Sequence, residues 1–110
     1  MKFAIPLANG KLTAHFGHCQ EFALVDVEAD QIKKKEVVVP PPHEPGVLPK
    51  WLHDLGINVV IAGGMGQRAI GLFEEKGIKV VTGASALDPE TLIMSYLNNT
   101  LKTGSNVCDH

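Results

Sequence analysis

The second half of the chain alternates between apolar segments and a helical pattern, and this alternation restricts the fold more than any other feature. Residues 59–62 and 80–81 are short, almost continuous apolar segments, typical of strands covered on both faces of a sheet. Between them, Ala69, Ile70 and Phe73 recur at helical spacing. A strand, a helix and a strand joined by short connections require parallel strands and a right-handed crossover. The sequence therefore predicts an α/β fold.

The first half of the chain predicts strands. Residues 3–5 form an apolar segment that ends at Pro6, and residues 22–27 and 32–39 form two more. Residues 28–31 are short enough for a hairpin turn, so the second and third strands should pair antiparallel.

Two further helices are expected, one on either side of this strand–helix–strand unit. One apolar helical face is formed by Leu48, Trp51, Leu52 and Leu55. Asp88 and Pro89 suit the N-cap and first position of a last helix that stops near Gly104. This last helix should bury Ile93, Tyr96, Leu97 and Leu101. We expect the core to include Leu24, Val25, Trp51, Val60, Ile61, Ile70, Phe73, Val80, Val81 and Leu97.

These elements predict a mixed five-stranded sheet with helices on both faces. With the first strand placed between the hairpin and the fourth strand, the strand order is 3-2-1-4-5. The connections after the first and fourth strands then run to opposite sides, and such a switch point leaves a crevice at the carboxyl ends of the strands. Residues 7–20, 63–66 and 83–87 should meet there.

Composition limits the classes of function. The 110 residues are read as a single domain spanning residues 1–110, and a net charge of −2 argues against a nucleic-acid partner. No apolar segment approaches the roughly 20 residues of a membrane span. No signal peptide fits before Pro6, so we expect a cytoplasmic protein without a membrane partner. In that reducing compartment, Cys19 and Cys108 should remain thiols.

Residues 7–20 concentrate potential metal ligands. His15, His18 and Cys19 lie within five positions, and imidazole and thiolate suit zinc, copper and iron–sulfur species. The spacing His-x-x-His-Cys is not that of a zinc finger. Two interpretations remain: a metal site, or two polar loop histidines beside a small buried cysteine.

A glycine-rich turn and the chain terminus offer two further groups of candidates. Gly63, Gly64 and Gly66 precede a helix whose N–H groups and dipole, together with Arg68, could bind an anion. The P-loop and dinucleotide patterns are absent, and a tight strand-to-helix turn is the alternative. Cys108 and His110 could join a metal site if the last helix returns them to the crevice, or could belong to a frayed tail.

Several of these segments together resemble a known family. They are His15-Phe16-Gly17, residues 61–66 at the start of a helix, residues 73–78, and Gly83-Ala84. The chain is similar to the dinitrogenase iron–molybdenum cofactor biosynthesis domain found in NifX, NafY and the carboxy-terminal part of NifB. The resemblance implies an RNase H-like three-layer α/β/α fold and the binding or carrying of metal–sulfur clusters or their precursors.

The resemblance also implies site residues. His15 and Gly17 match the loop pattern of the family, the three glycines match its turn, and Cys108 with His110 resembles the Cys/His tail of some members. The leading hypothesis is a non-catalytic carrier or chaperone of an iron–molybdenum or other metal–sulfur cluster, which serves a cluster-receiving protein. One alternative is a small-ligand or nucleotide-sensing module that uses residues 63–66. A nuclease of the RNase H-like type is disfavoured, because residues 3–5 carry no acid.

Overall fold

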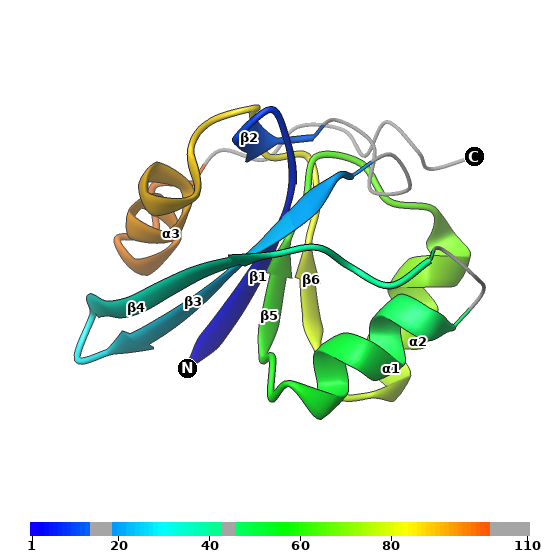
Figure 1. Cartoon of the computed structure of the whole chain (residues 1–110). Helices are drawn as coiled ribbons and strands as arrows, with labels where there is room; N and C mark the ends of the chain where they lie inside the picture. Colours follow the sequence, from blue (N-terminus) through cyan, green and yellow to red (C-terminus); the bar gives the residue numbers. More distant parts are fainter. Residues whose placement is uncertain (14–18, 43–45, 102–110) are drawn as a thin grey trace.

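The computed structural model describes residues 1–13, 19–42 and 46–101, and these contain six strands and three helices (Figure 1). The strands are β1 (Lys2–Ala8), β2 (Lys11–Leu12), β3 (Glu21–Glu28), β4 (Gln31–Val38), β5 (Val59–Ile61) and β6 (Lys79–Val81). The helices are α1 (Val47–Asp54), α2 (Gln67–Glu75) and α3 (Pro89–Leu97).

All six strands belong to one mixed sheet. Five of them lie in the order β4-β3-β1-β5-β6, and β2 pairs only with β1. β1 is antiparallel to β3 and parallel to β5, with Phe3 opposite Val25 on one side and Val59 on the other. β1 and β5 are therefore the parallel neighbours that the crevice at the switch point requires.

The sixth strand corrects the prediction of a five-stranded sheet. Asn9 and Gly10 both have positive φ angles, 56° and 81°, which form the two-residue turn of a hairpin. The chain then folds back as β2, and Leu12 lies opposite Leu7 in the core. The sequence analysis placed no strand within residues 7–20, whereas the structure forms β2 in their first part.

Pro6 does not end the first strand as predicted. It lies buried inside β1, opposite Phe22 of β3. The parallel pairs with β5 involve Phe3 and Ala4, nearer the start of β1. Because Pro6 lies beyond these pairs, its missing N–H removes no hydrogen bond from the ladder with β5.

The predicted hairpin between β3 and β4 is confirmed. Ala29 and Asp30 are its two turn residues, with φ angles of 51° and 60°, and Glu28 pairs with Gln31 across the turn. Two consecutive positive φ angles define a turn whose twist matches that of the flanking strands.

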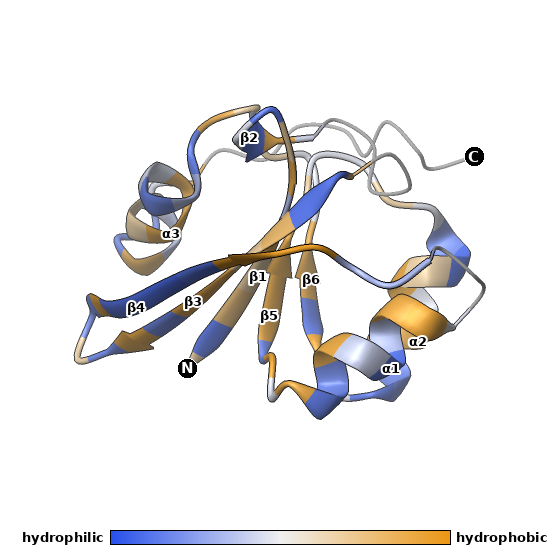
Figure 2. Ribbon diagram, viewed as in Figure 1, coloured by the Kyte–Doolittle hydropathy of each residue, from blue (hydrophilic) through white to orange (hydrophobic). Residues whose placement is uncertain are grey.

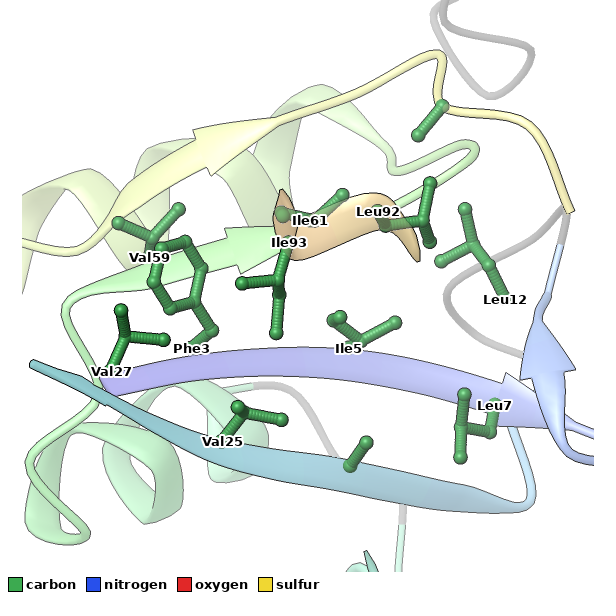
Figure 3. Packing of buried hydrophobic residues seen from close by; sticks show 12 residues of the cluster. Phe3, Ile5, Leu7, Leu12, Val25, Val27, Val59, Ile61, Leu92 and Ile93 are labelled. Carbon is green, nitrogen blue, oxygen red and sulfur yellow. The ribbon is translucent and has the colours of Figure 1, made fainter. Parts of the chain in front are cut away.

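Helices cover both faces of the sheet, as expected. On one face, α3 packs against β1, β3 and β5, and Figure 3 shows Phe3, Ile5 and Ile61 directed toward Ile93 of this helix. On the other face, α1 and α2 form a second core with the sheet, which includes Leu52 and Phe73. The result is a three-layer α/β/α arrangement (Figure 1).

The burial of the predicted core residues differs from the expectation in part. Val25, Val60, Ile61 and Phe73 are buried. The other six are only partly buried, namely Leu24, Trp51, Ile70, Val80, Val81 and Leu97. For Val80 and Val81 the reason is position, because β6 is an edge strand of the sheet.

The last helix is shorter than predicted. α3 ends at Leu97, and Asn99 then adopts a left-handed conformation with φ 58°. Thr100 donates its N–H to the carbonyl of Ser95 (2.8 Å), which terminates the helix before Gly104. Leu101 still packs against the core on the α3 face.

Candidate functional site

The carboxyl ends of β1, β5 and β6 lie at one end of the sheet, at the top of Figure 1, and this end is called the carboxyl edge. At this edge, the N–H of Thr13 donates to the carbonyl of Pro6 (3.0 Å), and that of Gln20 donates to Leu7 (2.7 Å). The residues that flank positions 14–18 are therefore held on the end of β1.

The other two connections meet the same edge. The N–H of Gly83 donates to the carbonyl of Gly63 at 2.6 Å, which joins the connection after β6 to the turn after β5. Leu12 of β2 donates its N–H to the carbonyl of Leu87 at 3.1 Å. The expected meeting of residues 7–20, 63–66 and 83–87 is confirmed by these bonds between described residues.

The link from β2 to Leu87 was missed by sequence reasoning. It depends on β2, which was itself not predicted. The dipeptide Asn9-Gly10 is the signal that could have revealed it, because this dipeptide is typical of two-residue hairpin turns.

The glycine turn leads directly into α2. Gly63 and Gly64 are buried, whereas Gly66 is exposed and forms the N-cap of α2 with φ −65° and ψ 150°. No side chain caps this helix, its first turn carries no acidic residue, and Arg68 is exposed in that turn. The start of α2 is therefore suited to an anion.

The start of α3 is built differently, although it follows the neighbouring strand. Asp88 caps α3 by accepting hydrogen bonds from the N–H (3.2 Å) and hydroxyl (2.8 Å) of Thr91. These hydrogen bonds lower the pKa of the Asp88 carboxyl. A carboxylate already occupies the first turn of α3, so of these two helices only α2 begins without one.

Cys19 is the one predicted metal ligand that lies within the described residues. Its side chain is 8% exposed and belongs to the same buried cluster as Met65 of the glycine turn and Phe73 of α2. Burial raises the pKa of the Cys19 thiol from 9.0 to about 11, and a backbone hydrogen bond partly opposes this shift. The thiol is thus protonated at neutral pH, and a metal would have to displace the proton.

This shift gives a testable dependence of stability on pH. Because the folded pKa lies above the unfolded one, the contribution of Cys19 is complete below pH 9 and is lost between pH 9 and about 11. We expect the difference in unfolding free energy between wild type and Cys19→Ser, measured by urea denaturation, to decline across that window. The matched variant Cys108→Ser should retain the wild-type decline. Loss of the decline in Cys108→Ser rather than in Cys19→Ser would contradict the assignment of this pH dependence to Cys19.

The remaining predicted ligands lie outside the described residues. These are His15, Gly17, His18, Cys108 and His110. Within the described part of the chain, no group of three or more His, Cys, Asp or Glu side chains is arranged to hold a metal ion. In that same part, no helix has the length and apolar character needed to cross a membrane.

Nearly the whole chain matches a known protein family. The family described as dinitrogenase iron–molybdenum cofactor matches residues 1–99. The chain belongs to this dinitrogenase iron–molybdenum cofactor family. The match includes the glycine turn and the residues around Cys19, whereas Cys108 and His110 lie beyond it.

Individual proteins are similar to this chain, in sequence or in structure, over most of its length. The uncharacterized protein MJ0580 of Methanocaldococcus jannaschii is 34% identical over 85 residues, which are 73% of this chain and 72% of that protein. The crystal structure of PH0822 superposes with a TM-score of 0.88 at 35% identity and covers 96% of both chains. The apo form of the orange protein from Desulfovibrio gigas shares the fold, with a TM-score of 0.74, 22% identity and coverage of 96% and 93%.

Proposed function

We propose that this chain is a small, non-catalytic cytoplasmic protein that carries or chaperones a metal–sulfur cluster or its precursor, of the iron–molybdenum or a related type, for a receiving protein. The observation that carries the proposal is the start of α2. In a member of the dinitrogenase iron–molybdenum cofactor family, this helix begins at the carboxyl edge without a side-chain cap, and its N-cap Gly66 directly follows Met65, which belongs to the same buried cluster as Cys19.

The anionic character of such a cargo supports this site. Thiomolybdate and iron–sulfur clusters carry negative charge. The first N–H groups of a helix have no carbonyl partner within the helix, and its dipole places positive potential there. Arg68 adds a full positive charge in the first turn. Apart from the immediate chain neighbours of Gly66 and the helix backbone, no atom of the described residues lies within 4 Å of the position that a Cβ of Gly66 would occupy, which leaves room for a ligand there.

Soft donors would ligate the metal itself. Cys19 supplies a thiol in the same cluster as Met65 of the glycine turn, and we assign His15 and His18 to the same site, with Cys108 and His110 as secondary ligands. Ligation requires the thiolate and neutral imidazole. Binding should therefore release protons and weaken on acidification.

The proposal includes an RNase H-like assignment of the three-layer fold, which the strand order β4-β3-β1-β5-β6 supports. A nuclease of that type is not favoured, because two-metal phosphoryl transfer needs clustered carboxylates. The central strand β1 carries none. A nucleotide-sensing role at residues 63–66 would use the same helix start without a metal. Binding of a phosphate ligand in the absence of metal would distinguish this role from that of a cluster carrier.

Two substitutions at Gly66 test the anion site. The backbone of Gly66 suits any residue, so Gly66→Asp and Gly66→Asn should both cap α2 and preserve the fold. Only aspartate places a negative charge beside the cargo. We expect Gly66→Asp to weaken binding of tetrathiomolybdate about ten-fold, measured anaerobically by absorption titration, and Gly66→Asn to bind much like wild type.

Several outcomes would contradict this function. Equal affinity of the aspartate and asparagine variants for tetrathiomolybdate would show that the anion does not bind at the start of α2. Saturable binding of a nucleotide without any binding of tetrathiomolybdate would favour the sensing module. Anaerobic purification from the native host, followed by elemental analysis and an ultraviolet–visible spectrum, should find a metal with the protein.

A further inference from the structure

The strand β4 forms one edge of the sheet, at the opposite end of the strand order from β6 (Figure 1). Within the described residues it pairs only with β3, so its outer row of backbone N–H and C=O groups has no strand partner. Figure 2 shows the strand hydrophilic over its first part and hydrophobic at its end. Val37 and Val39 at this end are 46% and 76% exposed. An exposed edge of this kind is a template for an added strand.

Positive charge is concentrated on the same strand. Lys33, Lys34 and Lys35 are consecutive and exposed, in a chain whose net charge is −2. Lys35 forms an ion pair with Glu90 of α3 at 2.8 Å, which ties the edge strand to the helix layer. Within the described structure, Lys33 and Lys34 form no ion pair. Lys34 lies opposite Asp26 of β3, whereas Lys33 lies at the register shift and has no acidic residue directly opposite. The open edge therefore carries ammonium groups that form no ion pair.

A hollow of about 250 Å³ lies beside this edge, on the face of the hairpin toward α1. Its apolar lining comes from Leu24 of β3, Val38 of β4 and Trp51 of α1, and Lys34 and Glu36 lie at its β4 side. Side chains on this face of a strand added to β4 would lie next to the hollow. The edge thus offers backbone pairing, positive charge and an apolar recess together.

A second copy of this chain fits the edge less well than an acidic chain does. In a symmetric antiparallel pair of β4 strands, one residue lies directly opposite its own copy. A pair centred on Lys34, Lys35 or Glu36 places like charges across the interface, which is destabilising. A pair centred on Val37 avoids this repulsion but places Lys35 opposite Val39, so the lysines gain no acidic partner. Charge complementarity therefore favours a different, acidic chain.

We propose that β4 is a docking strand for an extended, acidic segment of a partner protein. The segment adds to the sheet through backbone hydrogen bonds, sets carboxylates beside the lysines of β4, and places apolar side chains on the face of the hollow. Backbone pairing supplies affinity, and the alternating side chains supply specificity.

The docking strand ends near the candidate site. β4 is antiparallel to β3, which is antiparallel to β1, so β4 and β1 point the same way. Val38 lies opposite Phe22, and Phe22 lies opposite Pro6. Two strand spacings, about 10 Å, therefore separate Val38 from the end of β1 where the site begins. That the partner is the protein receiving the cargo rests on the proposed function, whereas the docking itself does not.

The test uses the full chain without metal and an acetylated peptide of sequence Glu-Val-Glu-Val-Glu-Val-Glu. We expect saturable binding below about 1 mM, with chemical-shift changes at the β4 amides and a change in fluorescence of Trp51, the one tryptophan of the chain. Lys33→Glu/Lys34→Glu should weaken binding about ten-fold. The control Lys11→Glu/Lys76→Glu makes the same change in net charge at two exposed positions off β4 and should bind much like wild type.

Backbone pairing is tested with the same peptide N-methylated at alternate residues, which we expect to bind about ten-fold more weakly. Equal affinity of the methylated peptide, or equal weakening by the two double variants, would overturn strand addition at β4. So would the absence of binding, or a β4-mediated dimer in sedimentation. Because no metal is present, these outcomes leave cargo binding to be judged by the Gly66 variants.

Discussion

Replacing Phe73 by alanine should lower the free energy of unfolding by about 3–5 kcal/mol. The side chain of Phe73 is fully buried, and it packs in the cluster that joins α1 and α2 to the sheet. The substitution removes a large apolar group and leaves a cavity in this interface. A rigid interior collapses only partly around such a cavity.

Urea denaturation monitored by circular dichroism measures this loss. Met94→Ala on α3 is the control, because this side chain is 39% exposed and its truncation should cost well under 1 kcal/mol. A loss below about 1 kcal/mol for Phe73→Ala would contradict the packing of α2 described above. Since α2 also carries the candidate anion site, the Phe73→Ala variant should bind tetrathiomolybdate more weakly under any condition in which the variant is partly unfolded.

Removing single donors from the segment around Cys19 should weaken cargo binding at least about ten-fold each, or about 1.4 kcal/mol. The variants are His15→Ala, His18→Ala and Cys19→Ser. The physical reason is that a metal held by few soft donors loses a full coordination bond with each of them. Anaerobic titration with tetrathiomolybdate and iron, followed by metal analysis, gives affinity and stoichiometry.

A truncation after Val107 separates the tail from the loop as the source of ligands. It removes Cys108, Asp109 and His110 and leaves residues 1–107 in place. If the three loop variants retain wild-type affinity and stoichiometry, the loop is not the site. If only the truncation abolishes binding, the tail supplies the ligands. The Cys19→Ser variant also serves as the test of proton release, because binding should lose part of its pH dependence.

Local sequence patterns predicted the features that depend on neighbouring residues. The hairpin between β3 and β4, the helix starting at Asp88 and Pro89, and the turn of Gly63 to Gly66 all follow from such patterns. In each case the chemistry that forms the feature lies within a few positions, as when Asp88 caps the N–H of Thr91. The edge at which the candidate site lies also followed from the sequence, because parallel strands end together.

Features that depend on distant contacts were decided by the tertiary structure. Pro6 was expected to end a strand, but it is accommodated because the β5 pairs lie nearer the start of β1. Trp51 was expected in the core, yet it is only partly buried and lines the hollow beside β4. Its ring packs edge-on against that of Phe22, with 5.6 Å between the ring centroids. The burial of Cys19, and hence its raised pKa, depends on a cluster built from segments along most of the chain, from Ala4 to Ile78.

The amino-acid pattern alone was sufficient for the fold class, the layers and the candidate donors, since periodicity and short-range capping report which groups must be buried or hydrogen-bonded. It could not show that α2 begins without a side-chain cap next to the connection after β6, or that β4 presents an open edge. Those properties arise from which strands become neighbours, and neighbours are chosen by packing among residues far apart in the chain. The bond from Gly83 to Gly63 illustrates this, because it joins two turns that are separated in sequence by an entire helix and strand.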